Sequence, residues 1–491
     1  MKNKQQWGTS GDAIFLTLIK LVTILLGLTV TRLLSQYLSV YDYGTYSQIL
    51  LVVSTTASLT ILGMVDGVNY FYGTQRDPER REAFVSTVFA LQCAISAAAG
   101  CLVMMLSAPL CAYFDNPDVS RLLIFAAALP MMQNMLSMFQ VLLVAVGKAR
   151  LLAVRNLVVS LIRLAAVLLV VLVVRDVKVI LLTTLVLDAG QILLFRKILG
   201  GRGCSLRILA VEGKLVKPIL RYCVPMGIFT AISVLNRDCD KYLVALMTDT
   251  TTLAVYANAS KLLPFDIVMN SFCTVLIPHI TRRVAEDDKA GAAKLYRLFL
   301  EISFLSTGIL CCAALAAAPQ LMELLYSEKY LGGLWVFFIY ILVDMVRFTN
   351  ISLVLSAAGK AIWLMCYSIG ALTMNVVLNY VFFRWLGVCG PALATLVTTV
   401  VLGLVILRSG AKVLDSGWRG LVDGKFLGMF ALESLLLTAL LYFVQTRLAA
   451  ANWNYLAILV LVCGTYGGVM LLLHGKRLLR DLKQVNRATD K

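Results

Sequence analysis

Charged residues are scarce in this sequence. Only 14% of its 491 residues are Asp, Glu, Lys or Arg, whereas a soluble domain has roughly 25%. So few polar side chains could not cover the roughly three soluble domains that the length alone would suggest. The hydrophobic share of 60% and the mean hydropathy of +0.85 indicate an all-α polytopic membrane protein. At about 20 residues per span, this apolar content would fill roughly fourteen membrane-spanning helices.

Signals of catalysis are also scarce. The chain has two histidines, His279 and His474, and its 12 cysteines include no CxxC pair. Most of these cysteines lie in apolar runs, where a thiol behaves as a small hydrophobe. No HExxH, GxSxG or Walker sequence is present. The sequence therefore predicts no enzyme, no metal site and no cofactor.

Apolar runs of spanning length divide the chain into four parts. Six runs fall within residues 1–195 and predict an N-terminal six-helix bundle. A basic stretch, 196–217, predicts a cytoplasmic linker, and six further runs within 218–408 predict a second bundle. Residues 409–491 contain two additional spans and a basic tail. The fourteen expected spans are 12–34, 46–71, 84–108, 120–146, 151–174, 178–195, 218–236, 253–278, 298–318, 333–357, 361–383, 388–408, 426–446 and 453–473.

The net charge of +17 reflects topology and does not indicate nucleic-acid binding. The basic residues stand in short gaps between apolar runs, where they set orientation and meet anionic headgroups. When both termini are placed in the cytoplasm, the inside segments hold more than three times as many Lys and Arg residues as the outside segments. The asymmetry predicts that both termini are cytoplasmic.

Short matches recur at a nearly constant offset between the halves. Tyr46 matches Tyr256 and Pro109 matches Pro319, both 210 residues later, and Gly147 matches Gly359 after 212 residues. Because each half has an even number of spans, the two halves point the same way across the membrane. The sequence thus predicts two parallel six-helix bundles plus two C-terminal helices, with a binding cavity between repeats.

Polar side chains inside the spans are the candidate binding residues, since polar groups in hydrocarbon usually face an interior cavity. In one span, Asn156, Ser160 and Arg163 share a helical face, and Asn375 and Asn379 do so in the matching span of the second half. The other intramembrane cations are Lys20, Lys261 and Arg347. We expect these eight residues to contact the substrate.

Two interpretations of the intramembrane cations remain open. Lys20 and Arg163 have no acidic residue within one turn, so they either face a cavity or pair with a carboxylate from another helix. The possible partners are Asp66, Asp188 and Glu433. Arg347 has Asp344 three residues before it, which favours a salt bridge within one helix. For Lys261, substrate binding and pairing with nearby Asp266 are equally favoured.

Three segments resemble one family of transporters. Residues 38–47, LSVYDYGTYS, resemble the L-x-x-x-x-Y-G-x-Y signature of polysaccharide-export flippases, and VYANASKL at 255–262 and AGK at 358–360 resemble other recurring pieces. That family belongs to the multidrug/oligosaccharidyl-lipid/polysaccharide exporter superfamily, which also holds the lipid II flippases. The likeness covers essentially the whole chain, including two six-helix bundles and two extra C-terminal helices.

The resemblance implies a flippase in the cytoplasmic membrane of a bacterium. Its substrate would be an undecaprenyl-pyrophosphate-linked oligosaccharide for polysaccharide biosynthesis, moved by alternating access through a cationic central cavity. Its partners would be this substrate, membrane lipids and the glycosyltransferases or polymerase of polysaccharide assembly, and the chain would act as a monomer without nucleic acid.

Two other functions compete with the flippase. A multidrug antiporter of the same superfamily would exchange H⁺ or Na⁺ at membrane carboxylates, for which Asp66, Asp188, Asp344 and Glu433 are the candidates. A membrane glycosyltransferase or polymerase would need acidic residues in a sizeable outer loop, whereas the expected outer loops are short.

Overall fold

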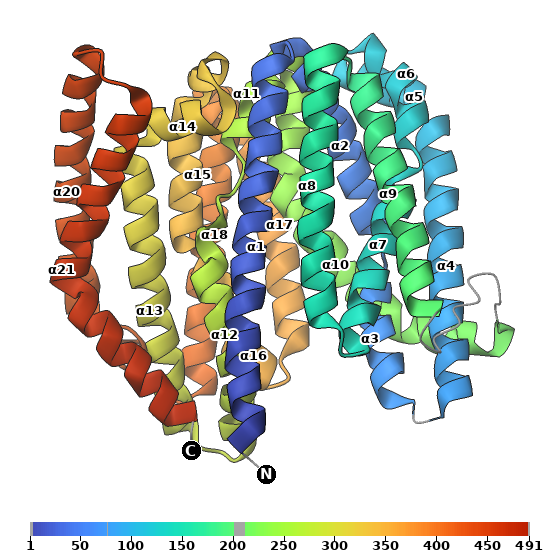
Figure 1. The fold of residues 1–491 in the computed structure, drawn as a ribbon. Coiled ribbons are helices and arrows are strands. Elements are labelled where there is room, and N and C mark those ends of the chain that lie inside the picture. The colour runs from blue at the N-terminus through green and yellow to red at the C-terminus, as the bar shows by residue number, and fades with distance from the viewer. Residues whose placement is uncertain (1–2, 76, 201–211, 490–491) are drawn as a thin grey trace. The chain divides into compact units, whose positions relative to one another are not determined.

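The computed structural model describes residues 3–75, 77–200 and 212–489, and within these ranges every regular element is a helix (Figure 1). The predicted all-α class is confirmed. By its internal contacts the chain forms two compact units, residues 1–254 and 255–491. The boundary between the two units lies further along the chain than the expected linker at 196–217. The helix that follows the linker, Gly213–Met247, therefore belongs to the first unit.

The first unit is built from ten helices and the start of an eleventh. Helix starts follow the local sequence: Asp77 accepts a hydrogen bond from the Glu79 N–H where Pro78 opens a helix, an arrangement favoured at helix N-termini. The helices are α1 (Asn3–Tyr37), α2 (Val40–Thr60), α3 (Met64–Thr74), α4 (Pro78–Met105), α5 (Ser107–Phe114), α6 (Pro117–Ala126), α7 (Leu129–Ala145), α8 (Ala149–Val173), α9 (Val177–Gly200) and α10 (Gly213–Met247).

The second unit begins within α11 (Thr250–Ala259) and contains several short or interrupted helices. Its elements are η1 (Pro264–Asp266), α12 (Ile267–Ala285), α13 (Lys289–Ala316), α14 (Ala318–Tyr326), η2 (Glu328–Gly333), α15 (Leu334–Val346), η3 (Arg347–Asn350), α16 (Leu353–Ala357), α17 (Ala361–Leu386), α18 (Cys389–Val413), α19 (Trp418–Leu421), α20 (Gly424–Ala450) and α21 (Tyr455–Thr489).

The number of membrane-spanning helices is close to the fourteen expected. Twelve helices in the described ranges are long and apolar enough to cross a membrane, and the pair α6–α7, bent by 40°, raises the number to thirteen. The remaining expected span, 253–278, is not one continuous helix, because α11 ends at Ala259 and α12 begins only at Ile267. Pro264 explains the interruption, since proline has no N–H and disfavours helix in the residue before it.

The repeat predicted from short sequence matches extends to whole helices. α1 and α10 each contain 35 residues and begin 210 residues apart, and α4 and α13 each contain 28 residues and begin 211 apart. The loops repeat as well: Gly147 and Gly359 both have positive φ, +79° and +68°, and stand two residues before the first residues of α8 and α17. Glycine adopts this conformation without steric cost.

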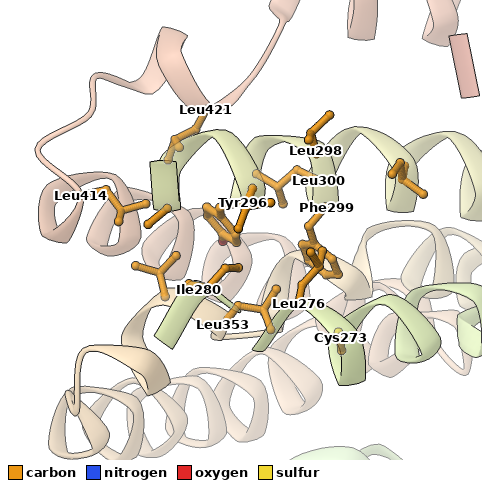
Figure 2. Packing of buried hydrophobic residues seen from close by; sticks show 14 of the residues in the cluster. Cys273, Leu276, Ile280, Tyr296, Leu298, Phe299, Leu300, Leu353, Leu414 and Leu421 are labelled. Atoms are coloured by element: carbon orange, nitrogen blue, oxygen red, sulfur yellow. The ribbon is translucent and has the colours of Figure 1, made fainter. Parts of the chain in front are cut away.

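Each unit has its own apolar core. In the first unit Phe89 packs against Phe139, whose ring stacks on Phe195 at a centroid distance of 5.4 Å. In the second unit, Tyr296 and Phe299 of α13 lie among aliphatic side chains of α12, α16 and α18 (Figure 2). Close packing of such side chains fixes the helix positions that carry the polar residues.

Candidate functional site

A polar cavity of about 610 Å³ lies inside the first unit, lined by residues of α1, α2, α7, α8 and α9. Three of the predicted binding residues, Asn156, Ser160 and Arg163, line it from α8. They share one face because steps of four and seven residues return close to the same helical angle. Asp188 lines the same cavity from α9. The fold therefore brings four of the predicted residues to one site.

Arg163 forms an ion pair with Asp188 across α8 and α9. Arg163 Nη2 lies 2.9 Å from Asp188 Oδ1, so Asp188 is the one of the three considered carboxylates that pairs with this arginine. The Asp188 side chain is only 3% exposed, whereas that of Arg163 is 43% exposed. A guanidinium has five N–H donors. Arg163 can thus stay paired with Asp188 and still present other donors to the cavity.

A second arginine, Arg155, lines the cavity and was missed by the sequence analysis. Its side chain is buried, and its guanidinium lies 4.3 Å from the centroid of the Phe195 ring. Arg155 Nη1 donates to Asn156 Oδ1 at 2.8 Å, and Nη2 donates to Gln191 Oε1. Its place near the start of an apolar run made it look like a loop residue. The available signal was its position two turns before Arg163.

Gln191 connects the two arginines through Asp188. Its Nε2 donates to Asp188 Oδ1 at 2.9 Å while its Oε1 accepts from Arg155. Arg163, Asp188, Gln191 and Arg155 thus form one chain of hydrogen bonds along the wall of the cavity. Two guanidinium groups and one carboxylate leave this wall with a net charge of +1. Such a surface attracts an anion, and a phosphate accepts paired N–H groups from arginine.

Two of the predicted residues of the first unit lie apart from this cavity. Lys20 is exposed on α1 and is not among the lining residues, although Thr23, about one turn further along α1, is. Asp66 is partly buried in α3 and does not line the cavity either. The assignment of Lys20 to substrate binding therefore stays a prediction.

Lys261, Asp344 and Arg347 lie around two helix interruptions in the second unit. Lys261 stands in the non-helical segment after α11, where its Nζ donates to Asn258 Oδ1 at 3.0 Å. Asp344 Oδ2 accepts the N–H of Leu263 from the same segment at 2.7 Å. Arg347 opens the turn η3 and pairs with Asp344 at 3.4 Å, which is the short-range salt bridge that the spacing favours. Asp266 was the ion-pair partner considered for Lys261, but its side chain is not among those that the structure describes.

The other predicted residues of the second unit lie within helices, and two of them are buried. Asn375 and Asn379 lie one turn apart on α17, each 1% exposed. Glu433 of α20 pairs with His474 of α21, with 2.7 Å between Oε2 and Nε2. Glu433 therefore has a partner inside its own unit. Among the described residues, no group of three or more His, Cys, Asp and Glu side chains is placed to hold a metal ion.

Sequence comparison identifies one family. A family model described as "Polysaccharide biosynthesis protein" matches residues 30–333, well over half of the chain. No curated protein matches the sequence.

Several solved structures share the fold. The lipid II flippase MurJ, in an inward closed conformation, superposes with a TM-score of 0.72 at 15% identity, covering 96% of this chain and 99% of that one. An inward-facing multidrug resistance MATE family transporter of the MOP superfamily gives 0.62 at 14% identity, covering 80% and 94%. A MOP superfamily transporter from Pyrococcus furiosus gives 0.56 at 14% identity, covering 82% and 94%. At these identities the likeness is one of fold.

Proposed function

Because the chain belongs to the family of polysaccharide biosynthesis proteins, we propose that it is a flippase for a lipid-linked oligosaccharide. In this proposal it acts in the cytoplasmic membrane of a bacterium, with both termini in the cytoplasm. The substrate is an oligosaccharide joined by pyrophosphate to a polyprenyl chain. The fold shared with the lipid II flippase MurJ supports this class of substrate.

The observation that carries the proposal is the hydrogen-bonded chain of Arg163, Asp188, Gln191 and Arg155 in the cavity of the first unit. In the proposal, the pyrophosphate binds the N–H groups of the two arginines that face the cavity. Charge-assisted hydrogen bonds between arginine and phosphate are roughly twice as strong as neutral ones. The nearby amide and hydroxyl groups of Asn156 and Ser160 then face the first sugars.

Asp188 has a separate role in the proposal, because it stabilises the cavity when no substrate is bound. An unpaired charge in the middle of a membrane costs roughly 2.5–3.5 kcal/mol on the insertion scale. Pairing with Asp188 offsets part of that penalty for Arg163, and the partial exposure of Arg163 leaves it able to meet an anion. The carboxylate thus also fixes the orientation of the guanidinium.

The antiporter alternative gains less from the structure. An antiporter needs a carboxylate that exchanges H⁺ or Na⁺ during transport, yet Asp188 is engaged by Arg163 and Gln191. Asp344 is likewise engaged by Leu263 and Arg347, and Glu433 by His474, so Asp66 is the remaining candidate for such an exchange. The proposal therefore assigns the chain to lipid-linked saccharides and gives it no catalytic step.

A reconstituted flipping assay tests this function. The full chain is placed in liposomes that contain a fluorescent undecaprenyl-pyrophosphate-linked saccharide, and movement between leaflets is measured with a membrane-impermeant quencher. We expect the wild type to flip the lipid and Arg163→Gln to lose at least about tenfold in rate, which corresponds to about 1.4 kcal/mol. Arg163→Lys keeps the charge without the planar fork, so it should retain partial activity.

The double variant Arg163→Gln/Asp188→Asn separates binding from folding. Removing Arg163 alone leaves the Asp188 carboxylate buried and unpaired, which is destabilising, and the second change removes that charge. We expect the double variant to purify like the wild type and still not flip the lipid. Recovery of both folding and flipping would show that Arg163 serves only as an ion-pair partner. Arg384→Gln, on an exposed arginine of α17, is the matched control and should flip normally.

A further inference from the structure

A second charged cavity, of about 420 Å³, lies in the second unit among α13, α20 and α21. The helix α13 contributes Lys294, Arg297 and Glu301, and α21 contributes Arg477, Arg480 and Asp481. Asp423, directly before α20, closes one side. None of these residues takes part in the cavity of the first unit.

This cavity lies at the level where spanning helices leave the membrane. The helices α13 and α20 are both candidate membrane spans. Lys294 is in the second turn of α13, and Asp423 caps the start of α20. Asp481 lies near the end of α21, a helix of 35 residues and hence roughly 50 Å long. The hydrocarbon core is only about 30 Å thick. The end of α21 therefore extends into the headgroup region.

Part of the charge in this cavity is already balanced. Glu301 pairs with Arg297 at 2.8 Å and with Arg477 at 3.3 Å. Asp423 pairs with Arg477 at 3.2 Å and with Arg297 at 3.7 Å. Two arginines and two carboxylates thus form a closed, neutral ring that ties the three helices together.

Three further charged groups in the cavity are left outside this ring. Lys294 and Arg480 are exposed and form no ion pair within the described part of the chain. Asp481 is only 5% exposed, and its buried Oδ2 has no hydrogen-bond partner. A buried acceptor without a donor is unfavourable and rare in folded proteins. The cavity therefore offers two cations to an anion and one buried carboxylate to an N–H donor.

We propose that this cavity binds the headgroup of an aminophospholipid such as phosphatidylethanolamine. The lipid phosphate lies between Lys294 and Arg480, and the primary ammonium group donates hydrogen bonds to Asp481 Oδ2. The acyl chains then follow α21 on its membrane side, where Leu472, Leu473 and Leu479 are exposed. A basic pocket between helices at this level is a common form of lipid headgroup site.

The chemistry distinguishes this lipid from its neighbours in the membrane. Phosphatidylcholine carries the same charges, but its quaternary nitrogen has no N–H to donate to Asp481. Phosphatidylglycerol has the phosphate but no ammonium group, so nothing in its headgroup offsets the negative charge of the Asp481 carboxylate. Discrimination between ethanolamine and choline headgroups is therefore the specific signature of the site.

Native mass spectrometry of the full chain in detergent tests the proposal. The protein is mixed with equal amounts of phosphatidylethanolamine, phosphatidylcholine and phosphatidylglycerol that have identical acyl chains. We expect ethanolamine lipid to be retained about tenfold better than choline lipid, equivalent to about 1.4 kcal/mol. Equal retention of these two lipids by the wild type would refute the proposal without any variant. Preferential retention of phosphatidylglycerol would refute it as well.

Variants assign the preference to individual residues. Asp481→Asn should abolish the preference for ethanolamine over choline lipid, whereas Lys294→Gln/Arg480→Gln should weaken binding of both. Lys483→Gln, on an exposed lysine of α21 outside the cavity, should change neither. An unchanged preference in a folded Asp481→Asn variant would show that this carboxylate does not meet the ammonium group. Equally tight binding of free phosphoethanolamine would identify a soluble ligand and contradict the lipid assignment.

Discussion

Asn134 and Asp344 are 210 residues apart in matching helices of the repeat, and each side chain holds an interrupted helix of its own unit. Asn134 Nδ2 donates to the carbonyl oxygen of Ala57 and to Thr60 Oγ1, both at 3.0 Å, at the end of α2. Asp344 Oδ2 accepts the N–H of Leu263 after the end of α11. One side chain therefore donates to a carbonyl group and the other accepts from an N–H group.

This difference predicts unequal costs for exchanging the two residue types. Asn134→Asp places a carboxylate against the Ala57 carbonyl and removes both donors, so it should lower the free energy of unfolding by about 2–3 kcal/mol. Asp344→Asn should cost less, because an amide oxygen can still accept from Leu263. Thermal unfolding of both variants in detergent measures the difference. A larger loss for Asp344→Asn than for Asn134→Asp would show that the pair with Arg347 dominates at that position.

Gln191→Glu is predicted to weaken anion binding, and it also replaces the Nε2 donor to Asp188 by a second carboxylate oxygen. The new carboxylate would lie against the guanidinium of Arg155, so the two arginines would face two carboxylates and the site would lose its net positive charge. We expect at least about a tenfold loss in affinity for the proposed lipid-linked substrate, or about 1.4 kcal/mol. Gln133→Glu, which lines the same cavity from α7, is the control for adding a charge elsewhere. An equal loss in both variants would mean that net charge matters and the position of Arg155 does not.

Cysteine labelling checks the predicted orientation of the chain. Single cysteines replace Gly73 and Gly417 on the expected inner side, and Asp115 and Asn452 on the expected outer side, in a chain without its 12 native cysteines. All four positions are exposed. An impermeant thiol reagent added to intact cells should label only the last two. Labelling at position 73 in intact cells would show that the predicted orientation is wrong.

Acid should weaken the start of α20 through Asp423. The N–H of Phe426 donates a hydrogen bond to this carboxylate and holds its pKa below the usual value for aspartate, and Arg477 and Arg297 lower it further. A carboxylate with a depressed pKa stabilises the fold above its unfolded-state pKa and loses that effect as the pH falls through the folded-state value. The unfolding temperature of the wild type should therefore decrease as the pH drops below about 4. In Asp423→Asn the unfolding temperature should decrease less over the same pH range. Identical acid profiles would exclude this contribution.

Hydropathy and repeats were sufficient to predict the helical class, the approximate number of spans and the two-fold repeat. Long apolar runs allow few structures in a membrane, because the backbone must satisfy its own hydrogen bonds there. The interruptions were missed, since Ser260–Leu263 and Arg347–Asn350 lie inside segments that remain apolar on average. Pro264 was a sequence signal for the first interruption, but the exact positions also depend on contacts such as that between Leu263 and Asp344, which a single sequence does not reveal.

The candidate site was only partly predictable, for a related reason. The spacing of Asn156, Ser160 and Arg163 identifies one face of one helix, and the structure places all three on the cavity of the first unit. Which acidic residue meets Arg163 depends on how α8 and α9 pack, so Asp188 could not be singled out. Arg155 was missed because a charge near the start of an apolar run is typical of a loop.

The equal lengths of α1 and α10, and of α4 and α13, are most simply explained by gene duplication. The two copies have since diverged where charge matters most, because Arg155 and Arg163 of the first copy correspond to Tyr367 and Asn375 of the second at the offset of 212. Because only the first copy has both arginines, the proposed function implies one anionic headgroup per chain in each transport cycle.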